Sequence, residues 1–366
     1  MPRLQAVKEA ALSRLFFCSV ACLLSLPAQG TPWSAHVEVQ GYASSRIMAI
    51  KPLIDRFEGD LKSGQDAVTR NQIRSGGSRG PWTVELLHRF DYEIEASRDF
   101  VEGYHALRNK STLDPGRRYA LSLEAWHVEA RGARVARAFQ FTPIIALTTG
   151  FSLLEGRKLL DGALEGSGIA SDADTLDYQI EVSYAYSRDV LFKRPVSPPS
   201  GTGVSMDLGL EINLDTRGTY RLQLWDAWGR MRWRNAPGTE AVANTDRDTS
   251  TPDNGLNPLV SGREFNQSFT QHFRPYLQAD AWLPLRERYW VGAALRGTES
   301  LIDLGISGGL RWGPDRIVGI SAYPSADAAG ITATWGGLKA QFVTDDLKLD
   351  RAAFLLVQLG YRHHFD

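Results

Sequence analysis

Hydrophobic and polar side chains alternate along the stretch Trp82–Ala96, which carries the clearest pattern in the chain. Its even-numbered positions are mostly apolar or aromatic, whereas its odd-numbered positions carry charges such as Glu85 and Arg89. Because successive side chains of a strand point to opposite faces, the pattern predicts a strand with one apolar and one charged face. The stretch is longer than an average soluble strand and is long enough to cross a bilayer at a tilt.

The same alternation returns in several later segments, most regularly at residues 178–186, 206–214, 302–312 and 353–365. Counting such segments gives about fourteen strands, an even number, as in single-chain bacterial barrels. The irregular region between residues 98 and 176 keeps twelve and sixteen strands open. The pattern therefore predicts an all-β fold, a transmembrane antiparallel β-barrel. A secreted β-sandwich is the alternative, because its strands also alternate.

Two regions lose the alternation and are rich in glycine or in polar residues. They lie near residues 48–81 and 234–267, and we expect them to be long loops on the outer side of the membrane.

The first thirty residues have the features of a secretory signal. Arg3, Lys8 and Arg14 precede a short apolar run, and small residues occupy the positions that a signal peptidase reads at Ala28-Gln29-Gly30. We expect cleavage before Thr31, which leaves residues 31–366 as one barrel domain. Export through the inner membrane would follow.

Both cysteines of the chain, Cys18 and Cys22, lie inside this signal. The mature chain would then contain no disulfide and no thiolate metal site. The alternative is that Cys22 becomes the lipidated first residue of a lipoprotein, because Ser19-Val20-Ala21-Cys22 weakly resembles a lipobox.

The chain ends in an alternating strand that carries Tyr361 and Phe365 on one face. This ending resembles that of Gram-negative outer-membrane β-barrel proteins, a porin-like class, in which an aromatic residue closes the last strand. Asp366 departs from that pattern by following the aromatic residue. The resemblance implies an outer-membrane location, contact with outer-membrane lipid, and recognition of the strand ending at Phe365 by the barrel-assembly machinery.

The formal charge of the chain is −1, and removal of three basic and one acidic residue with the signal brings it to −3. Phosphate binding needs a concentrated positive surface, so this balance argues against nucleic acid as a partner.

The polar faces of the predicted strands supply the candidate functional residues, because such faces line the lumen of a barrel. No catalytic signature or metal-ligand spacing occurs, since His363 and His364 are adjacent and point to opposite faces. The sequence thus predicts no catalytic residue, no metal ion and no cofactor. The candidate pore-lining or ligand-binding residues are Glu85, Arg89, Asp91, Glu93, Asp207, Glu211, Arg221, His272, Arg274, Tyr276, Asp280 and Arg311.

Rings of acidic and basic groups in a lumen select permeating solutes. The sequence therefore favours an outer-membrane channel for hydrophilic solutes, with saccharides or polysaccharide export as narrower possibilities. The alternative is a structural or binding barrel that acts through its surface loops. A barrel enzyme that modifies lipid or glycan ranks third. An open lumen and a lumen plugged by its own ion pairs are the two alternatives for such a barrel.

Overall fold

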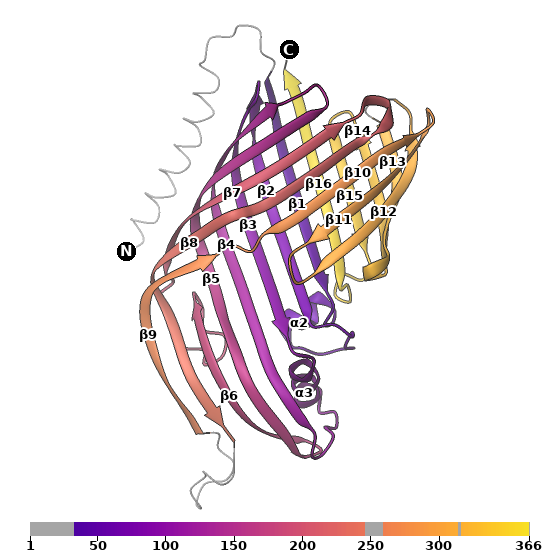
Figure 1. The fold of residues 1–366 in the computed structure, drawn as a ribbon. Coiled ribbons are helices and arrows are strands. Elements are labelled where there is room, and N and C mark those ends of the chain that lie inside the picture. The colour runs from indigo at the N-terminus through magenta and orange to yellow at the C-terminus, as the bar shows by residue number, and fades with distance from the viewer. Residues whose placement is uncertain (1–32, 246–258, 314–315, 366) are drawn as a thin grey trace, which may run out of the picture.

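The computed structural model describes residues 33–245, 259–313 and 316–365 (Figure 1). In these residues one sheet contains nearly all of the regular structure. Its strands are β1 (Trp33–Ser45), β2 (Asp66–Arg79), β3 (Trp82–Ala96), β4 (Arg118–Gln140), β5 (Ile145–Asp172), β6 (Thr175–Tyr186), β7 (Ser200–Asn213), β8 (Thr219–Asn244), β9 (Leu259–His272), β10 (Tyr276–Leu285), β11 (Tyr289–Gly297), β12 (Ile302–Arg311), β13 (Arg316–Tyr323), β14 (Ala328–Trp335), β15 (Leu338–Thr344) and β16 (Phe354–Phe365). The helices are α2 (Ile50–Asp55) and α3 (Arg98–Asn109).

The sixteen strands amount to fourteen passages along a closed barrel. Strands β6 and β7 together form one neighbour of β8, and β9 and β10 together form its other neighbour. The first pair is interrupted at residues 187–199 and the second at residues 273–275. The antiparallel pairing of β8 with β10, in which Leu222 lies opposite Ala279, closes the circuit. The predicted all-β antiparallel barrel of about fourteen strands is confirmed.

The two ends of the barrel differ. At one end, which we call the turn end, short connections join β2 to β3, β4 to β5, β7 to β8 and β14 to β15. At the other, the loop end, lie α2, α3 and longer connections. Strand β5 and the distal parts of β4 and β8 run past the rest of the barrel there, and β6 and β9 pair with them. We call this extension the lobe; it fills the lower part of Figure 1.

The outer face of the barrel carries an apolar belt. On β7 every outward position from Ile212 to Val204 is apolar, a run of nine residues. A strand that spans a bilayer needs about 9–11 residues. Exposed apolar side chains continue the belt on other strands at Phe151, Leu153, Leu222, Val291, Leu304, Ile306, Val318, Ile320 and Ile331. Exposed aromatic side chains lie near the turn end at Trp33, Trp82, Tyr220, Tyr289, Trp312, Trp335 and Tyr361.

Helix α3 packs against the outer face of the lobe. Its first turn is capped by Ser97, whose side chain accepts a hydrogen bond from the backbone N–H of Phe100. Its apolar side joins a cluster that includes Tyr119 and Leu121 of β4. No helix in the described ranges is long and apolar enough to cross a membrane.

The predicted loop at residues 48–81 is wrong in its second half, which forms β2. The reason lies in the composition of both faces. Arg70 and Arg74 of β2 are buried inside the barrel, while Asn71 and Ser75 point outward. Because both faces are polar, the strand shows no alternation of hydropathy.

The predicted loop at residues 234–267 is also largely strand, since β8 continues to Asn244 and β9 begins at Leu259. These segments belong to the lobe, beyond the apolar belt, so neither face needs to be apolar. Residues 246–258 lie outside the described residues. The same holds for the predicted signal, its cleavage site before Thr31, and Cys22.

Candidate functional site

A network of ion pairs occupies the middle of the barrel. It arises because the inward positions of β2, β3 and β4 carry charges of both signs in adjacent registers. The central pair joins Arg89 of β3 to Asp226 of β8, with nitrogen–oxygen distances of 2.8 and 2.5 Å. Arg89 also pairs with its neighbour Asp91, from Nε to Oδ2 at 2.6 Å. All three side chains are almost completely buried.

Asp226 sits at an irregularity of β8, where the register against β7 shifts and its own φ is +53°. This left-handed conformation is uncommon for a residue other than glycine. It turns the Asp226 carboxylate inward, where Ser205 donates a hydrogen bond of 2.5 Å to it. The backbone N–H of Asp226 in turn donates to Asp207 at 3.0 Å.

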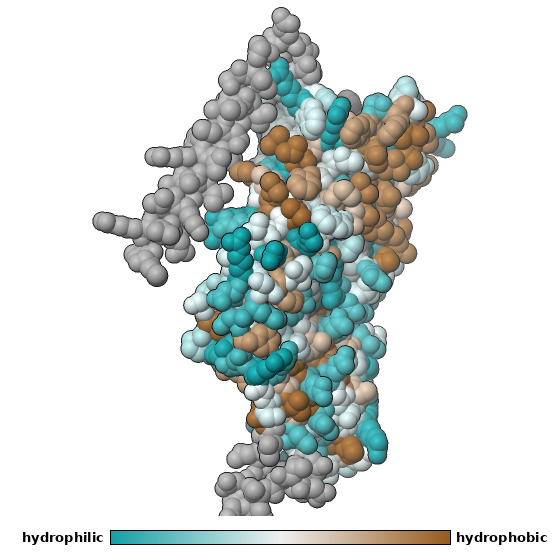
Figure 2. Space-filling view, turned by 60° about the vertical axis from the view of Figure 1, so that its left-hand side comes forward, coloured by the Kyte–Doolittle hydropathy of each residue, from teal (hydrophilic) through white to brown (hydrophobic). Residues whose placement is uncertain are grey.

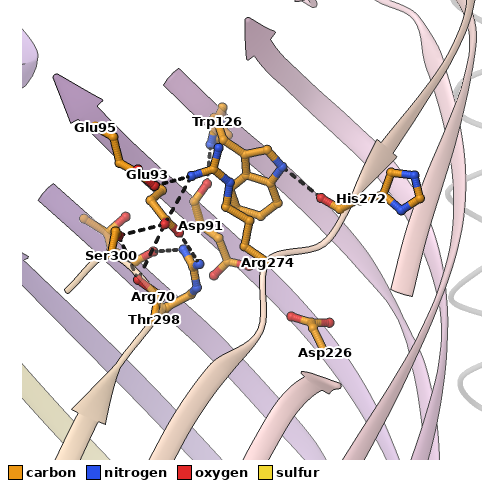
Figure 3. A network of polar contacts seen from close by, with 12 residues as sticks. Arg70, Asp91, Glu93, Glu95, Trp126, Asp226, His272, Arg274, Thr298 and Ser300 are labelled. Atoms are coloured by element: carbon orange, nitrogen blue, oxygen red, sulfur yellow. Dashed lines mark hydrogen bonds and ion pairs between the residues drawn. The ribbon is translucent and has the colours of Figure 1, made fainter. Parts of the chain in front are cut away.

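A second part of the network lies toward the loop end, around Glu93 (Figure 3). Glu93 accepts from Arg70 of β2 at 2.7 Å and from Ser300 at 3.0 Å. Arg274, in the interruption between β9 and β10, reaches the same carboxylate at 3.2 Å and Glu95 at 2.9 Å. The chain at residues 273–275 is thereby tied to β3 inside the barrel.

A third part lies toward the turn end, around Arg134 of β4. Its guanidinium bridges Glu85 at 2.6 Å and Asp207 at 2.8 Å. Glu85 is also hydrogen-bonded to His36 of β1 at 2.8 Å. The guanidinium groups of Arg74 and Arg134 lie 4.5 and 5.3 Å from the ring centroid of Trp225.

Side chains also join opposite walls directly. Strands β1 and β10 are seven steps apart in either direction around the fourteen-membered circuit. Nevertheless, Gln40 of β1 donates a hydrogen bond of 3.0 Å to Gln278 of β10. The rings of Tyr42 and Tyr276, on the same two strands, lie 5.5 Å apart. Tyr42 also donates to Asp303 of β12 at 2.8 Å. The barrel is therefore flattened, and its walls meet across the lumen.

Two apolar clusters flank the network and fill the remaining interior. One contains Tyr42, Tyr276, Tyr323 and Phe354. The other contains Trp126, Trp233 and Phe273, together with parts of β4, β5 and β8. Between the two ends, the lumen enclosed by the described residues is closed by buried side chains.

A polar cavity of about 520 Å³ opens on the turn-end side of this closure. Arg74, Glu85, Arg134 and Trp225 of the network line its inner part. Farther out lie the ion pair of Glu211 with Arg221, at 2.9 Å, and the side chains of Glu38, Asp280 and Lys339. Charges of both signs and aromatic and amide groups thus face one cavity.

The structure places the predicted site residues in several different surroundings. Seven share the buried network or its edge: Glu85, Arg89, Asp91, Glu93, Asp207, Arg274 and Asp280. Glu211 and Arg221 line the outer cavity, and Tyr276 is buried in an apolar cluster. Arg311 lies near the turn end, over the ring of Trp282 and hydrogen-bonded to the Gly313 carbonyl at 2.8 Å, away from both groups.

The prediction that His272 faces the lumen was wrong. His272 lies opposite the exposed Arg230 and is itself exposed on the outer face of β9, and Figure 3 shows its ring pointing away from the network. Regular alternation through residues 268–283 would place His272 on the same face as Arg274 and Tyr276. The chain instead breaks at residues 273–275. The inward side chains therefore have odd numbers in β9, before the break, and even numbers in β10, after it.

Several residues of the network were missed. Asp226 directly follows the inward Trp225 and lies within the irregular segment of β8, so nothing in its spacing marks it as inward. Arg70 and Arg74 lay in the predicted loop. Arg134, and also Arg296, which donates to Asp280 at 2.5 Å, lie at inward positions of strands that carry the alternation only weakly. Pairing of a buried arginine with an inward acid on a neighbouring strand was the signal that could have found them.

The chain matches no family model and no curated protein. Among solved structures it is similar to the toluene transporter TodX of Pseudomonas putida, with 10% identity, a TM-score of 0.41, and coverage of 93% of this chain and 89% of that one. It is also similar to the translocator domain of the autotransporter NalP from Neisseria meningitidis, with 11% identity, a TM-score of 0.32, and coverage of 99% and 98%. A third similar structure is the monoaromatic hydrocarbon channel CymD, with 7% identity, a TM-score of 0.33, and coverage of 92% and 89%. Likenesses this distant carry no information about cargo or activity.

Proposed function

We propose that this protein is an outer-membrane barrel that acts as a gated channel for small hydrophilic solutes. The buried ion-pair network is its gate, and the turn-end cavity is its solute site. The observation that carries the proposal is the juxtaposition of the two, because Arg74, Glu85 and Arg134 belong to both.

The membrane location rests on the outer surface. The apolar belt on β7 is nine residues long, which matches a tilted spanning strand, and exposed aromatic side chains border it at the turn end. Within hydrocarbon, each unpaired backbone polar group costs several kcal/mol, so closure through β8 and β10 is what makes such a sheet stable there.

The chemistry of the closure favours a gate over a permanent plug. A buried ion pair adds little net stability compared with apolar residues of the same volume, because both charges lose their hydration. A plug that served stability alone would be built better from apolar side chains. Water can replace the partners of Arg89, Asp226 and Glu93, so each of these charges can be solvated when the ion pairs separate.

The cavity limits the size of the solute. Its volume of about 520 Å³ is that of a small-molecule site rather than of a polymer passage. Its walls carry both charges and the ring of Trp225, which suits polar solutes of the size of a small saccharide. Polysaccharide export through the closed lumen is disfavoured.

The test is planar-bilayer conductance of the purified mature protein. We expect the wild type to be closed for most of the time, with rare openings. The variant Arg89→Gln/Asp226→Asn, which replaces the central ion pair by neutral groups, should open at least tenfold more often. The variant Gln40→Ala/Gln278→Ala, which removes the contact between opposite walls, should act in the same direction.

The matched control is Arg263→Gln/Glu240→Gln, which removes an exposed ion pair of the lobe. It should conduct like the wild type. The proposal fails if both network variants fold, as judged by heat-modifiable migration, and remain closed. A wild type that stands permanently open would equally contradict it.

A second function is favoured by the lobe, whose strands continue beyond the belt. Binding of an external partner there would not need the lumen at all. Joining β8 to β9 by a short turn between Glu240 and Arg263, which lie opposite each other, shortens the lobe. Loss of a cell-surface binding activity in that variant, with conductance unchanged, would favour this function. An enzymatic role stays a prediction.

A further inference from the structure

Three arginines stand in a row on the outer face of β8. Arg230, Arg232 and Arg234 are exposed, and each points away from the lumen because Met231 and Trp233 between them are fully buried inside. Trp228, the outward residue before them, is 51% exposed and belongs to the apolar belt. The row thus begins where the belt ends.

Neighbouring strands continue this basic surface at the same height. Arg232 lies opposite Thr202 of β7, which lies opposite Glu155 of β5, which lies opposite Arg131 of β4. Arg157 and Lys158 of β5 stand one position farther from the belt. Six arginine and lysine side chains therefore share this band with two carboxylates, Glu129 and Glu155.

The two carboxylates are already engaged. Glu155 pairs with Arg131 at 3.1 Å, and Glu129 pairs with Lys158 at 2.6 Å. No carboxylate in the described part of the chain pairs with Arg230, Arg232 or Arg234. The guanidinium of Arg230 lies 5.8 Å from the ring centroid of Trp228, at the boundary of belt and band.

Figure 2 shows the corresponding arrangement on the face that it turns forward: hydrophobic side chains gather in the upper part, and hydrophilic ones cover the middle. A surface that changes from apolar to strongly basic within one row of residues is complementary to a lipid whose acyl chains end at a phosphate. Arginine binds phosphate through two parallel N–H donors, which fixes it more firmly than a point charge does.

We propose that Arg230, Arg232 and Arg234 form a binding site for the phosphate groups of an anionic lipid in the leaflet at the loop end. The occupant is a phosphorylated lipid rather than a soluble anion, because the apolar side chains of Trp228, Met206 and Leu153 lie directly beside the arginines and would contact its acyl chains. This site rests on the membrane location proposed above but not on channel activity.

The experiment uses the mature protein in detergent, mixed with diphosphorylated lipid A, and counts the lipid molecules retained by native mass spectrometry. We expect Arg232→Gln/Arg234→Gln to reduce retention at least fivefold relative to the wild type. Dephosphorylated lipid A should be retained weakly and equally by both proteins. The control Arg118→Gln/Lys348→Gln removes the same charge from exposed positions far along the lobe and in the β15–β16 connection, and should behave like the wild type.

Equal retention of phosphorylated lipid by the wild type and the β8 variant overturns the proposal. So does equal retention of phosphorylated and dephosphorylated lipid by the wild type. Competition by millimolar inorganic phosphate that displaces all lipid would identify a soluble-anion site instead and would also overturn it. Since retention is counted in closed, folded protein, a failed conductance experiment leaves these outcomes unaffected.

Discussion

Gln40 and Gln278 lie on diametrically opposite strands of the barrel and share one hydrogen bond of 3.0 Å. In a round barrel of fourteen strands, two such side chains would be separated by the full width of the lumen. The contact shows that the barrel is flattened along this direction. The ion pairs beside it, above all Arg89 with Asp226, complete the closure.

Loss of the central arginine should destabilise the barrel strongly. In Arg89→Ala, the buried carboxylates of Asp91 and Asp226 lose their main partner, and removing one member of a buried ion pair costs about 3–5 kcal/mol. Urea-dependent unfolding in lipid vesicles measures this loss. Arg263→Ala, which breaks an exposed pair, should cost no more than about 1 kcal/mol. Equal effects of the two substitutions would contradict the buried network.

The fold was predictable wherever one face of a strand contacts apolar surroundings and the other does not. Strands β3 and β7 and the end of β16 show this in their alternation, and the strand number followed from it. Strand β2 did not, since its inward arginines and outward small polar residues give no contrast. The strands of the lobe were not predicted for a related reason. They lie beyond the belt, so neither of their faces needs to be apolar.

The candidate site was predictable only where it lies on alternating strands. Glu85, Arg89 and Glu93 of β3 were found because they occupy the odd-numbered positions of the strand, which form its polar face. Asp226 and His272 lie at irregularities of two kinds. At the bulge of β8 the even-numbered Asp226 turns inward between odd-numbered inward residues, and at the break before β10 the inward positions change from odd to even numbers. Contacts across the lumen, such as that of Gln40 with Gln278, depend on the closure of the sheet and leave no trace in local spacing.

The indole of Trp233 should make two glycines irreplaceable. A Cβ on Gly201 would lie 2.7 Å from the ring, and one on Gly156 would lie 2.4 Å from it. Forcing a methyl group into such a packed site costs about 1–3 kcal/mol. We expect Gly201→Ala to lower the unfolding free energy by that amount. Gly308→Ala, where the nearest atom is 3.4 Å away, should change it by less than about 0.5 kcal/mol. A Gly201→Ala protein as stable as wild type would refute this packing.

Stability should depend on pH through Asp161 in the lobe. Burial raises the pKa of this carboxyl to about 6, above its ordinary value of 3.8. The folded state therefore holds the proton more tightly than the unfolded state, and the penalty of ionising Asp161 is relieved as pH falls from 7 toward 4. The difference is roughly 2–3 kcal/mol.

Asp161→Asn removes this ionisation. We expect the variant to be more stable than the wild type at pH 7 and nearly equal to it at pH 4, as measured by the difference in unfolding free energy at each pH. A difference that stays constant between the two pH values would show that Asp161 is not held in a desolvated site. A larger difference at pH 4 would reverse the predicted sign.

The most direct test of the central claim is thiol cross-linking across the lumen. The only cysteines, Cys18 and Cys22, precede Thr31, so a chain expressed from that residue offers a clean background. In Gln40→Cys/Gln278→Cys, a short bifunctional thiol reagent should join β1 to β10 within one molecule. The yield should approach that of Gln40→Cys/Gln358→Cys, whose positions are direct neighbours on β1 and β16. Efficient labelling of both thiols at 40 and 278 without any cross-link, while the neighbouring pair reacts, would contradict a barrel whose walls meet.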